Sequence, residues 1–292
     1  MRVEASVSEQ SIKHQGIKHQ GIEHQGLNHQ GVAVKWPDFI RPMHYGSVPD
    51  VDARYWAVMA MASVLGCNTG DDCSYYFGWN HWIGLGPLAL IFFAVLFGER
   101  RSSVRSQVWY WGAVIVLRTA ATNLADLATH TFALPYLQVI RGLAVLQALV
   151  VWPVAPRLLA AASDSKGRPA TGGWYWLSLL TAGTLGTAIG DWVADELHLS
   201  TGYGTLLLTA IFGLVLALGR RDGWTTKAAY WTAVIALRAA GTTAGDWLAF
   251  REDPGLHNGL NLGLPLSTAV SGAMFLGCLF AWRARKRGAF RN

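Results

Sequence analysis

Charged residues are scarce in this chain. Only 14% of its 292 residues are Asp, Glu, Lys or Arg, whereas soluble domains usually carry about 25%. Hydrophobic residues make up 52%, and the mean hydropathy of +0.25 is held down by a polar stretch over the first 50 positions. This balance argues against an ordinary soluble domain and favours helices that cross a membrane.

Cysteines and catalytic motifs are also few. The three cysteines include no CxxC pair and indicate no disulfide framework. Cys67 and Cys73 lie about 9 Å apart along one predicted helix, which is too far to bridge, so we interpret them as buried thiols. The sequence contains no Ser/His/Asp order, HExxH motif, haem-ligand His pair or phosphate-binding loop. These absences predict a protein that is not an enzyme and needs no cofactor.

Long apolar segments alternate with short polar breaks after residue 50. The segments are 54–76, 82–98, 109–131, 134–155, 174–196, 202–219, 229–250 and 260–282. Most reach the roughly 20 residues that a helix needs to cross a bilayer. The pattern predicts an all-α membrane protein with eight transmembrane helices in one domain, 51–285.

The eight segments are four copies of a two-helix unit. A Tyr-Trp pair opens every odd-numbered segment, and an aspartate follows each Trp by 15 residues. The pairs begin at Tyr55, Tyr110, Tyr175 and Tyr230, and the aspartates are Asp71, Asp126, Asp191 and Asp246. The predicted repeats are 54–98, 109–155, 174–219 and 229–282. Because alternate units lie 120 residues apart, we infer a duplicated hairpin that was duplicated again.

Basic residues predict the orientation of the helices. Most of the 24 Lys and Arg residues lie in the N-terminal tail, in the loops after even-numbered segments or in the basic tail 286–292, and the opposite loops contain only Arg251. By the positive-inside rule both termini are cytoplasmic. The net charge of +6 then reflects topology, so we expect the lipid of a cell (inner) membrane as the partner and no nucleic acid. The Tyr-Trp pairs would serve as anchors at the cytoplasmic interface.

The first 50 residues have a composition of their own. A five-residue repeat, IKHQG-IKHQG-IEHQG-LNHQG, precedes a stretch with three prolines. Such a composition cannot build a packed core, and it predicts a disordered cytoplasmic tail over 1–50. Loose metal binding by its four histidines is the alternative interpretation, and Met43 is an alternative start.

The repeated aspartates are the strongest functional signal. Each lies about 22 Å along its helix from the cytoplasmic interface, at a depth where a carboxylate must face the bundle interior, pair or be protonated. Small and polar residues recur on the same face, so we place the odd-numbered helices at the centre and the even-numbered ones against lipid. The candidate ion-binding residues are Asp71, Asp126, Asp191 and Asp246, supported by Arg118, Arg238, Asn68, Asn123, Thr187, Thr242, His130 and Asp195.

Two interpretations of this polar face stay open. In the first, a small transporter or channel moves a cation or a proton along an aspartate-lined pathway, and Asp126 with His130 relays protons. In the second, the protein is a scaffold in which Arg118 and Arg238 pair with aspartates while small residues allow close helix packing. The sequence names no metal, substrate or oligomeric state, and it leaves open a pseudo-fourfold ring or two bundles.

The four hairpins also resemble a known family. The Tyr-Trp pairs and the segment GTAIGDWVADELHLSTGYGTLLL resemble bacterial membrane-anchored proteins built from a repeat of unknown function. The resemblance covers about 54–282 and implies four tandem repeats, each with two transmembrane helices and a characteristic tryptophan, but no activity. Asp71, Asp191 and Asp246 match its Gly-Asp element, whereas Asp126 follows Ala125.

Overall fold

The computed structural model describes residues 49–76, 78, 80–101, 107–151, 171–219, 228–250 and 259–288. The histidine repeat and the rest of the predicted tail up to residue 48 lie outside the described residues. Over the described ranges the chain is helical and contains no strand. The predicted all-α class is therefore confirmed for this part of the chain.

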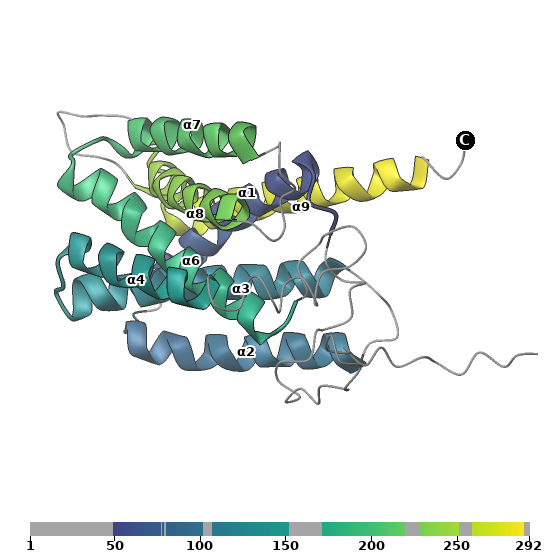
Figure 1. The fold of residues 1–292 in the computed structure, drawn as a ribbon, viewed down its shortest axis with the longest axis horizontal. Coiled ribbons are helices and arrows are strands. Elements are labelled where there is room, and N and C mark those ends of the chain that lie inside the picture. Colours follow the sequence, from purple (N-terminus) through teal and green to yellow (C-terminus); the bar gives the residue numbers. More distant parts are fainter. Residues whose placement is uncertain are drawn as a thin grey trace, which may run out of the picture. The chain divides into compact units, whose positions relative to one another are not determined.

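The described residues form eight α-helices, two in each predicted unit (Figure 1). The first helices of the units are α1 (Ala53–Asp71), α3 (Gln107–Asp126), α6 (Gly173–Asp191) and α8 (Ala228–Ala249). The second helices are α2 (His81–Arg101), α4 (Tyr136–Val151), α7 (Thr201–Gly219) and α9 (Leu264–Gly288). The predicted segments thus correspond to helices, with ends that differ by a few residues.

Three of the eight helices are long and apolar enough to cross a membrane by length and composition. They are α2, α7 and the Leu264–Trp282 part of α9, and α4 is apolar but shorter. All four are second helices of their units. The first helices carry the polar residues of the repeat, which lower their hydropathy.

A short π-helical turn follows the repeated aspartate in three units. These turns span Asp72–Tyr76, Leu127–Thr131 and Trp192–Glu196. The apolar segments did not predict them, because a π-turn has no distinct pattern of hydropathy. Such turns are rare and often mark functional sites.

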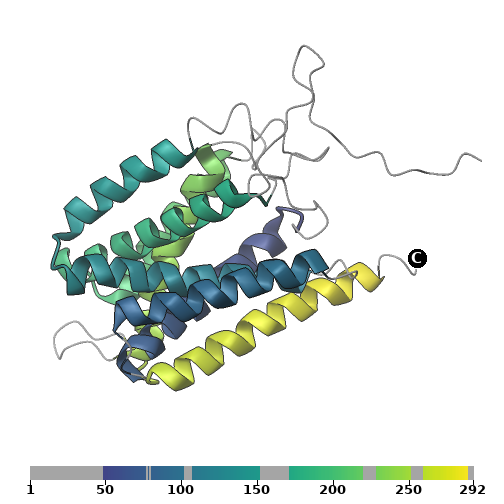
Figure 2. The ribbon, with the colours of Figure 1, turned by 90° about the horizontal axis from the view of Figure 1, so that it is seen from below.

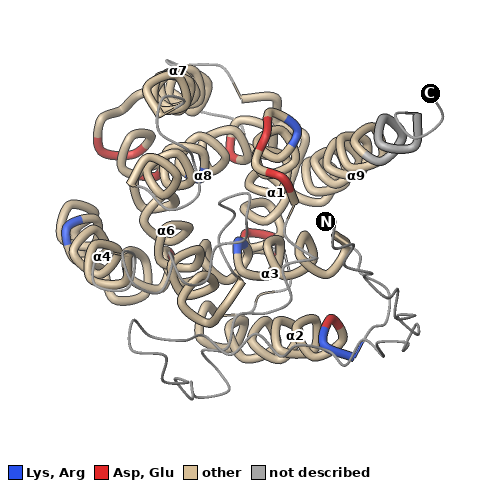
Figure 3. The backbone as a smooth tube through the Cα atoms, turned by 45° about the vertical axis from the view of Figure 1, so that its right-hand side comes forward, with Lys and Arg blue, Asp and Glu red and all other residues tan. Residues whose placement is uncertain are grey.

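The four first helices form a closed inner ring. Helix α1 packs against α3, α3 against α6, α6 against α8, and α8 returns to α1. The second helices lie outside this ring, with α4 and α9 on opposite sides of it (Figures 2 and 3). Of the two arrangements left open by the sequence, the structure has the pseudo-fourfold ring.

Each outer helix packs mainly on the inner helix of the following unit. Helix α2 lies on α3, α4 on α6, and α7 on α8, while α9 closes the circle on α1. Each unit is therefore held by its neighbours. The contact of α9 with α1 joins the fourth unit to the first, although these two helices lie at opposite ends of the domain's sequence. A single hairpin has no partner for its inner helix without its neighbours.

Glycines ten residues after the repeated Trp allow the inner helices to approach closely. A Cβ atom on Gly66 would lie 2.5 Å from Cγ of Arg118, and one on Gly186 would lie 2.4 Å from Cβ of Arg238. At Gly186 the backbone oxygen of Ile235 is also only 2.9 Å away. Side chains larger than hydrogen therefore do not fit at these two contacts without a shift of the helices.

The Tyr-Trp pairs lie in the core of the ring. The four tyrosines are 0–4% exposed, and the four tryptophans are 1–6% exposed. The ring of Tyr55 packs at a tilt against Trp111 of the next unit, with centroids 5.6 Å apart, and that of Tyr230 packs likewise against Trp56 at 5.7 Å, so the contact is repeated around the circle. Our interpretation of these pairs as interfacial anchors is wrong, because their side chains are buried: the tyrosines meet inside the ring, and tryptophans pack between the ring and the outer helices.

Candidate ion-binding site

Each inner helix contributes one residue to each of five layers, at intervals of four residues along the chain, or about 6 Å along the helix. From the helix starts, the layers are Tyr55, Tyr110, Tyr175 and Tyr230; Met59, Val114, Leu179 and Val234; Ser63, Arg118, Gly183 and Arg238; Cys67, Thr122, Thr187 and Thr242; and Asp71, Asp126, Asp191 and Asp246. We call the first the tyrosine layer, the fourth the threonine layer and the fifth the aspartate layer.

The tyrosine layer is a closed cycle of hydrogen bonds. The hydroxyl oxygens of Tyr55 and Tyr110 lie 2.8 Å apart, those of Tyr110 and Tyr175 2.6 Å, those of Tyr175 and Tyr230 3.3 Å, and those of Tyr230 and Tyr55 2.7 Å. Residues of the next layer are at most 2% exposed. Hydroxyls and aliphatic side chains therefore close this end of the ring.

Arg118 connects all four inner helices. Its Nε donates to the backbone oxygen of Ser63 at 3.2 Å, Nη1 donates to the hydroxyls of Thr122 and Thr187, and Nη2 donates to Thr242 at 2.7 Å. The side chain is 1% exposed. A guanidinium offers five donors in a rigid fork, and here they are used by neutral oxygens of the surrounding helices.

Arg238 occupies the equivalent position in the fourth unit but has few partners. Its Nη2 lies 3.4 Å from the sulfur of Met59. Within the described residues, its Nε and Nη1 atoms have no hydrogen-bond partner although the side chain is 1% exposed. The two arginines therefore extend toward different layers, Arg118 toward the threonines and Arg238 toward Met59, and the second is poorly compensated.

The interpretation that both arginines pair with aspartates is wrong. Within the part of the chain that the structure describes, the partners of Arg118 are hydroxyls and backbone oxygens, and that of Arg238 is a sulfur. An arginine eight residues before an aspartate lies about 12 Å away along the same helix. The neighbouring helices then offer hydroxyls of the threonine layer closer than carboxylates.

The four aspartates gather at the end of the ring opposite the tyrosines. Asp71 and Asp126 are 7% and 9% exposed, and Asp191 and Asp246 are partly buried. Asp191 interacts electrostatically with Asp71, Asp126 and Asp246, and Asp126 interacts with Asp246. The carboxylates predicted from the repeat are thus brought together, and their mutual repulsion favours a bound proton or cation.

Two histidines flank one of these carboxylates. Nδ1 of His130 lies 3.9 Å from Oδ1 of Asp126, and Nδ1 of His81 lies 4.0 Å from Oδ2. His130 was a predicted supporting residue, but His81 was not among the candidates because the repeat has no equivalent histidine. His81 also lies 3.2 Å from the hydroxyl of Ser74. Within the described residues, Asp126 therefore has two histidine neighbours, a residue type that can exchange protons near neutral pH.

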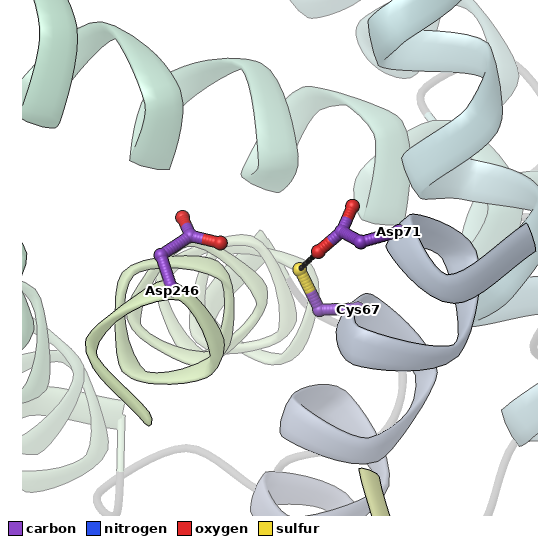
Figure 4. Close-up of side chains that lie close together, drawn as sticks. All are labelled: Cys67, Asp71 and Asp246. Atoms are coloured by element: carbon purple, nitrogen blue, oxygen red, sulfur yellow. Dashed lines mark hydrogen bonds between the residues drawn. The ribbon is translucent and has the colours of Figure 1, made fainter. Parts of the chain in front are cut away.

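The first and fourth units supply a mixed cluster to the same layer. The sulfur of Cys67 and carboxylate oxygens of Asp71 and Asp246 lie within 4.8 Å of one another. Figure 4 shows the three side chains meeting between α1 and α8. The thiol donates to Oδ2 of Asp71 at 3.8 Å. The sequence did not select Cys67, because the contact depends on the closure of the last unit onto the first.

The other predicted supporting residues are divided between the axis and the periphery. Thr187 and Thr242 hold Arg118 on the axis, as described above. Asn123 bonds back to the oxygen of Thr119 at 3.0 Å and packs toward α2 at Gly84. Asp195 is exposed, accepts a hydrogen bond from Tyr136 at 2.7 Å and joins α4 to the third unit. Asn68 is fully buried at the contact between α1 and α8.

Comparison with known proteins identifies the repeat. The family described as Repeat of Unknown Function (DUF347) matches twice, over residues 174–222 and 229–288. These two matches coincide with the third and fourth units, and they confirm the resemblance to a repeat family. No curated protein and no solved structure matches the chain.

Proposed function

We propose that the chain is a multi-pass protein of the cell (inner) membrane that carries a cation or exchanges protons at its aspartate layer. All eight helices span the bilayer, the four units run in parallel, and both termini face the cytoplasm. The aspartate layer then lies toward the outer face of the membrane. We propose no catalytic activity and no cofactor.

The distribution of apolar side chains supports the membrane placement. Large apolar residues of the outer helices are exposed, and examples are Phe93, Leu149, Leu214 and Phe280. The polar side chains of the repeat face the inner ring instead, where the outer helices shield them. This is the reverse of a soluble bundle, and a hydrocarbon environment accounts for it.

The single observation that carries the proposal is the gathering of four repeat-equivalent carboxylates in one layer. The other end of the axis is closed by the tyrosine layer and by aliphatic residues. Arg118 and Arg238 lie between the two ends, and a positive charge on the axis opposes the passage of a free cation. The arrangement therefore favours a carrier that changes conformation over an open channel. Parallel repeats of this kind are compatible with alternating access.

A scaffold is the second candidate, and the bonding of Arg118 favours it. That side chain donates hydrogen bonds to neutral oxygens of all four inner helices. Such bonding stabilises the helix bundle and does not require an ion. In a scaffold the aspartates would only help to hold the inner ring. The two candidates differ in what the loss of a carboxylate does to folding and to ion movement.

Flux through proteoliposomes tests the proposal. The purified full chain would be reconstituted, and proton and cation movement would be followed for a panel of ions in the wild type and in Asp191→Asn. We expect flux in the wild type and at least a tenfold loss in a variant that keeps its thermal stability. The matched control is Glu196→Gln, five residues further on, in an exposed side chain.

The scaffold predicts a different pair of results. No ion would move through protein shown to be folded, and Asp191→Asn would reduce the thermal stability in detergent. If all four single aspartate-to-asparagine variants unfold the protein, the carrier proposal loses its main support.

A further inference from the structure

We propose that Cys67, Asp71 and Asp246 form a site for a divalent transition-metal ion of the zinc type. The inference shares with the proposed function the idea that the aspartate layer binds cations, and it names the class of cation. The site is asymmetric: it uses one edge of the layer, where the first unit meets the fourth (Figure 4).

The geometry suits a small tetrahedral ion. The three donor atoms lie within 4.8 Å of one another, and the Cys67 sulfur is 3.8 Å from an oxygen of Asp71. Zinc binds sulfur at about 2.3 Å and oxygen at about 2.0–2.2 Å, which places tetrahedral ligand atoms about 3.5 Å apart. Binding of such an ion requires the donor atoms to move together by about 1 Å.

The type of donor separates this ion from alkali and alkaline-earth cations. The threonine layer has a hydroxyl in three units, and only the first unit replaces it with a thiol, Cys67. Oxygen donors alone suit Mg²⁺ or Ca²⁺, whereas a thiolate beside carboxylates selects softer ions such as Zn²⁺ or Co²⁺. Cys67, which replaces the threonine of the other units, is therefore the residue that shifts the preference of the site toward softer ions.

A buried amide without partners lies beside the cluster. Asn68 is 0% exposed, and within the described residues neither atom of its carboxamide has a hydrogen-bond partner. It lies one helical turn before Asp71, and its Oδ1 is 2.6 Å from the point that a Cβ on Gly245 would occupy, next to Asp246. The amide is thus directed into the contact between α1 and α8 in which the cluster lies. A carboxamide oxygen there is available as a further ligand or as an acceptor for metal-bound water.

The charges at this edge favour a cation. Asp71 and Asp246 carry two negative charges, a Cys67 thiolate adds a third, and Arg118 interacts electrostatically with Cys67 and Asp71. Asp126 and Asp191 add negative charge nearby, so a dication is attracted to the site. On binding, the S–H bond of Cys67 breaks and a metal–sulfur bond forms. The proton passes to solvent, so no electron is transferred and binding weakens as the pH falls.

Cobalt titration of the purified full chain tests the site. Co²⁺ bound to a thiolate in a tetrahedral site absorbs in the near ultraviolet, and Zn²⁺ displaces it. We expect this absorption in the wild type and its loss in Cys67→Thr, with at least tenfold weaker Zn²⁺ binding. Thr is the residue that the other three units carry at this position, so this variant is compatible with the fold. Cys73→Ser is the matched control and keeps the absorption.

Two outcomes overturn the metal site. One is the same absorption in Cys67→Thr as in the wild type, and the other is Co²⁺ binding to the wild type without thiolate absorption. In both cases proton flux that depends on Asp191 would leave the proposed function standing. Conversely, a Cys67-dependent cobalt spectrum in a protein that moves no ion would support the site and contradict the carrier.

Discussion

The inner and the outer helices of this protein follow different rules. The outer helices are apolar around most of their surface, and in the three that are long enough to cross a membrane only 11–28% of the most apolar window is buried. The inner helices bury polar, charged and small residues in regular layers. Hydropathy is therefore highest in the outer helices, whereas the repeated spacing of Tyr, Trp and Asp distinguishes the inner ones.

Glycine substitutions should sharpen this contrast most strongly. Gly186→Ala places a methyl group 2.4 Å from Cβ of Arg238 and 2.9 Å from a backbone oxygen, so we expect a loss of about 3 kcal/mol of stability or more. Gly213→Ala on outer helix α7 meets nothing within 4 Å, and it should be neutral or stabilise the helix by up to about 1 kcal/mol. Thermal unfolding in detergent measures both. Equal effects would contradict close packing of the inner ring.

The two buried arginines should respond in opposite ways to the same substitution. Arg118→Met removes hydrogen bonds to all four inner helices, and we expect a loss of about 2 kcal/mol. Arg238→Met removes a buried charge with two nitrogens that have no hydrogen-bond partner among the described residues, and it should be neutral or stabilising. Denaturant or thermal unfolding of the two variants measures these changes in stability. A larger loss for Arg238 would mean that its guanidinium has a partner in the working protein.

The hydroxyls of the tyrosine layer should each contribute measurably. Tyr110→Phe breaks two hydrogen bonds in the buried cycle, at 2.8 and 2.6 Å, and we expect a loss of about 1–2 kcal/mol. Tyr203→Phe on outer helix α7 changes a side chain that is 59% exposed and should stay within about 0.5 kcal/mol. Unfolding midpoints of both variants provide the comparison, and an unchanged Tyr110 variant would indicate that the cycle is open.

The N-caps of the inner helices give the smallest effect. Asp52 caps α1 by accepting from the backbone N–H groups of Arg54 and Tyr55, whereas Gly172 at the start of α6 has no side-chain cap. We expect Asp52→Ala to cost about 1 kcal/mol and Gly172→Ala to cost little. Urea or thermal unfolding of the two variants tests the difference.

The contribution of Asp52 also depends on pH. Partial burial alone would raise its pKa, but hydrogen bonds from Arg54 and from the backbone of Tyr55 outweigh this and hold the pKa below its usual 3.8. The stabilisation is therefore present above pH 3.8 and is lost as the pH falls through the lower pKa of the folded state. The Asp52→Ala variant should show the same stability as the wild type only at the acid end of this range.

Much of the fold could be predicted from the sequence. The eight helices follow from long apolar segments, and the central position of the odd-numbered helices follows from their polar stripe. The order of the ring also depends on how α9 returns to α1, a contact between the two ends of the domain. No local pattern in either segment specifies how the last unit meets the first, so the cluster of Cys67, Asp71 and Asp246 was not predicted.

The misread residues share a physical cause. Tyr-Trp pairs and intramembrane arginines were assigned by what such side chains usually do at an interface or beside a carboxylate. In the structure the tyrosines bond to one another, and Arg118 bonds to threonines. Fourfold repetition makes the tyrosine cycle possible, because a residue found once in each unit can complete a ring with its own equivalents, and it surrounds Arg118 with threonines of three units.

The central claim is that the axis is accessible at the aspartate layer and closed at the tyrosine end. Single cysteines would replace Asp191 or Leu179 in a chain without its three native thiols, in proteoliposomes of known orientation, and a membrane-impermeant thiol reagent would be added to one side at a time. We expect the cysteine at position 191 to react from the outer side alone and the one at 179 to react from neither side. Reaction at position 179, or reaction at 191 from the cytoplasmic side alone, would contradict it.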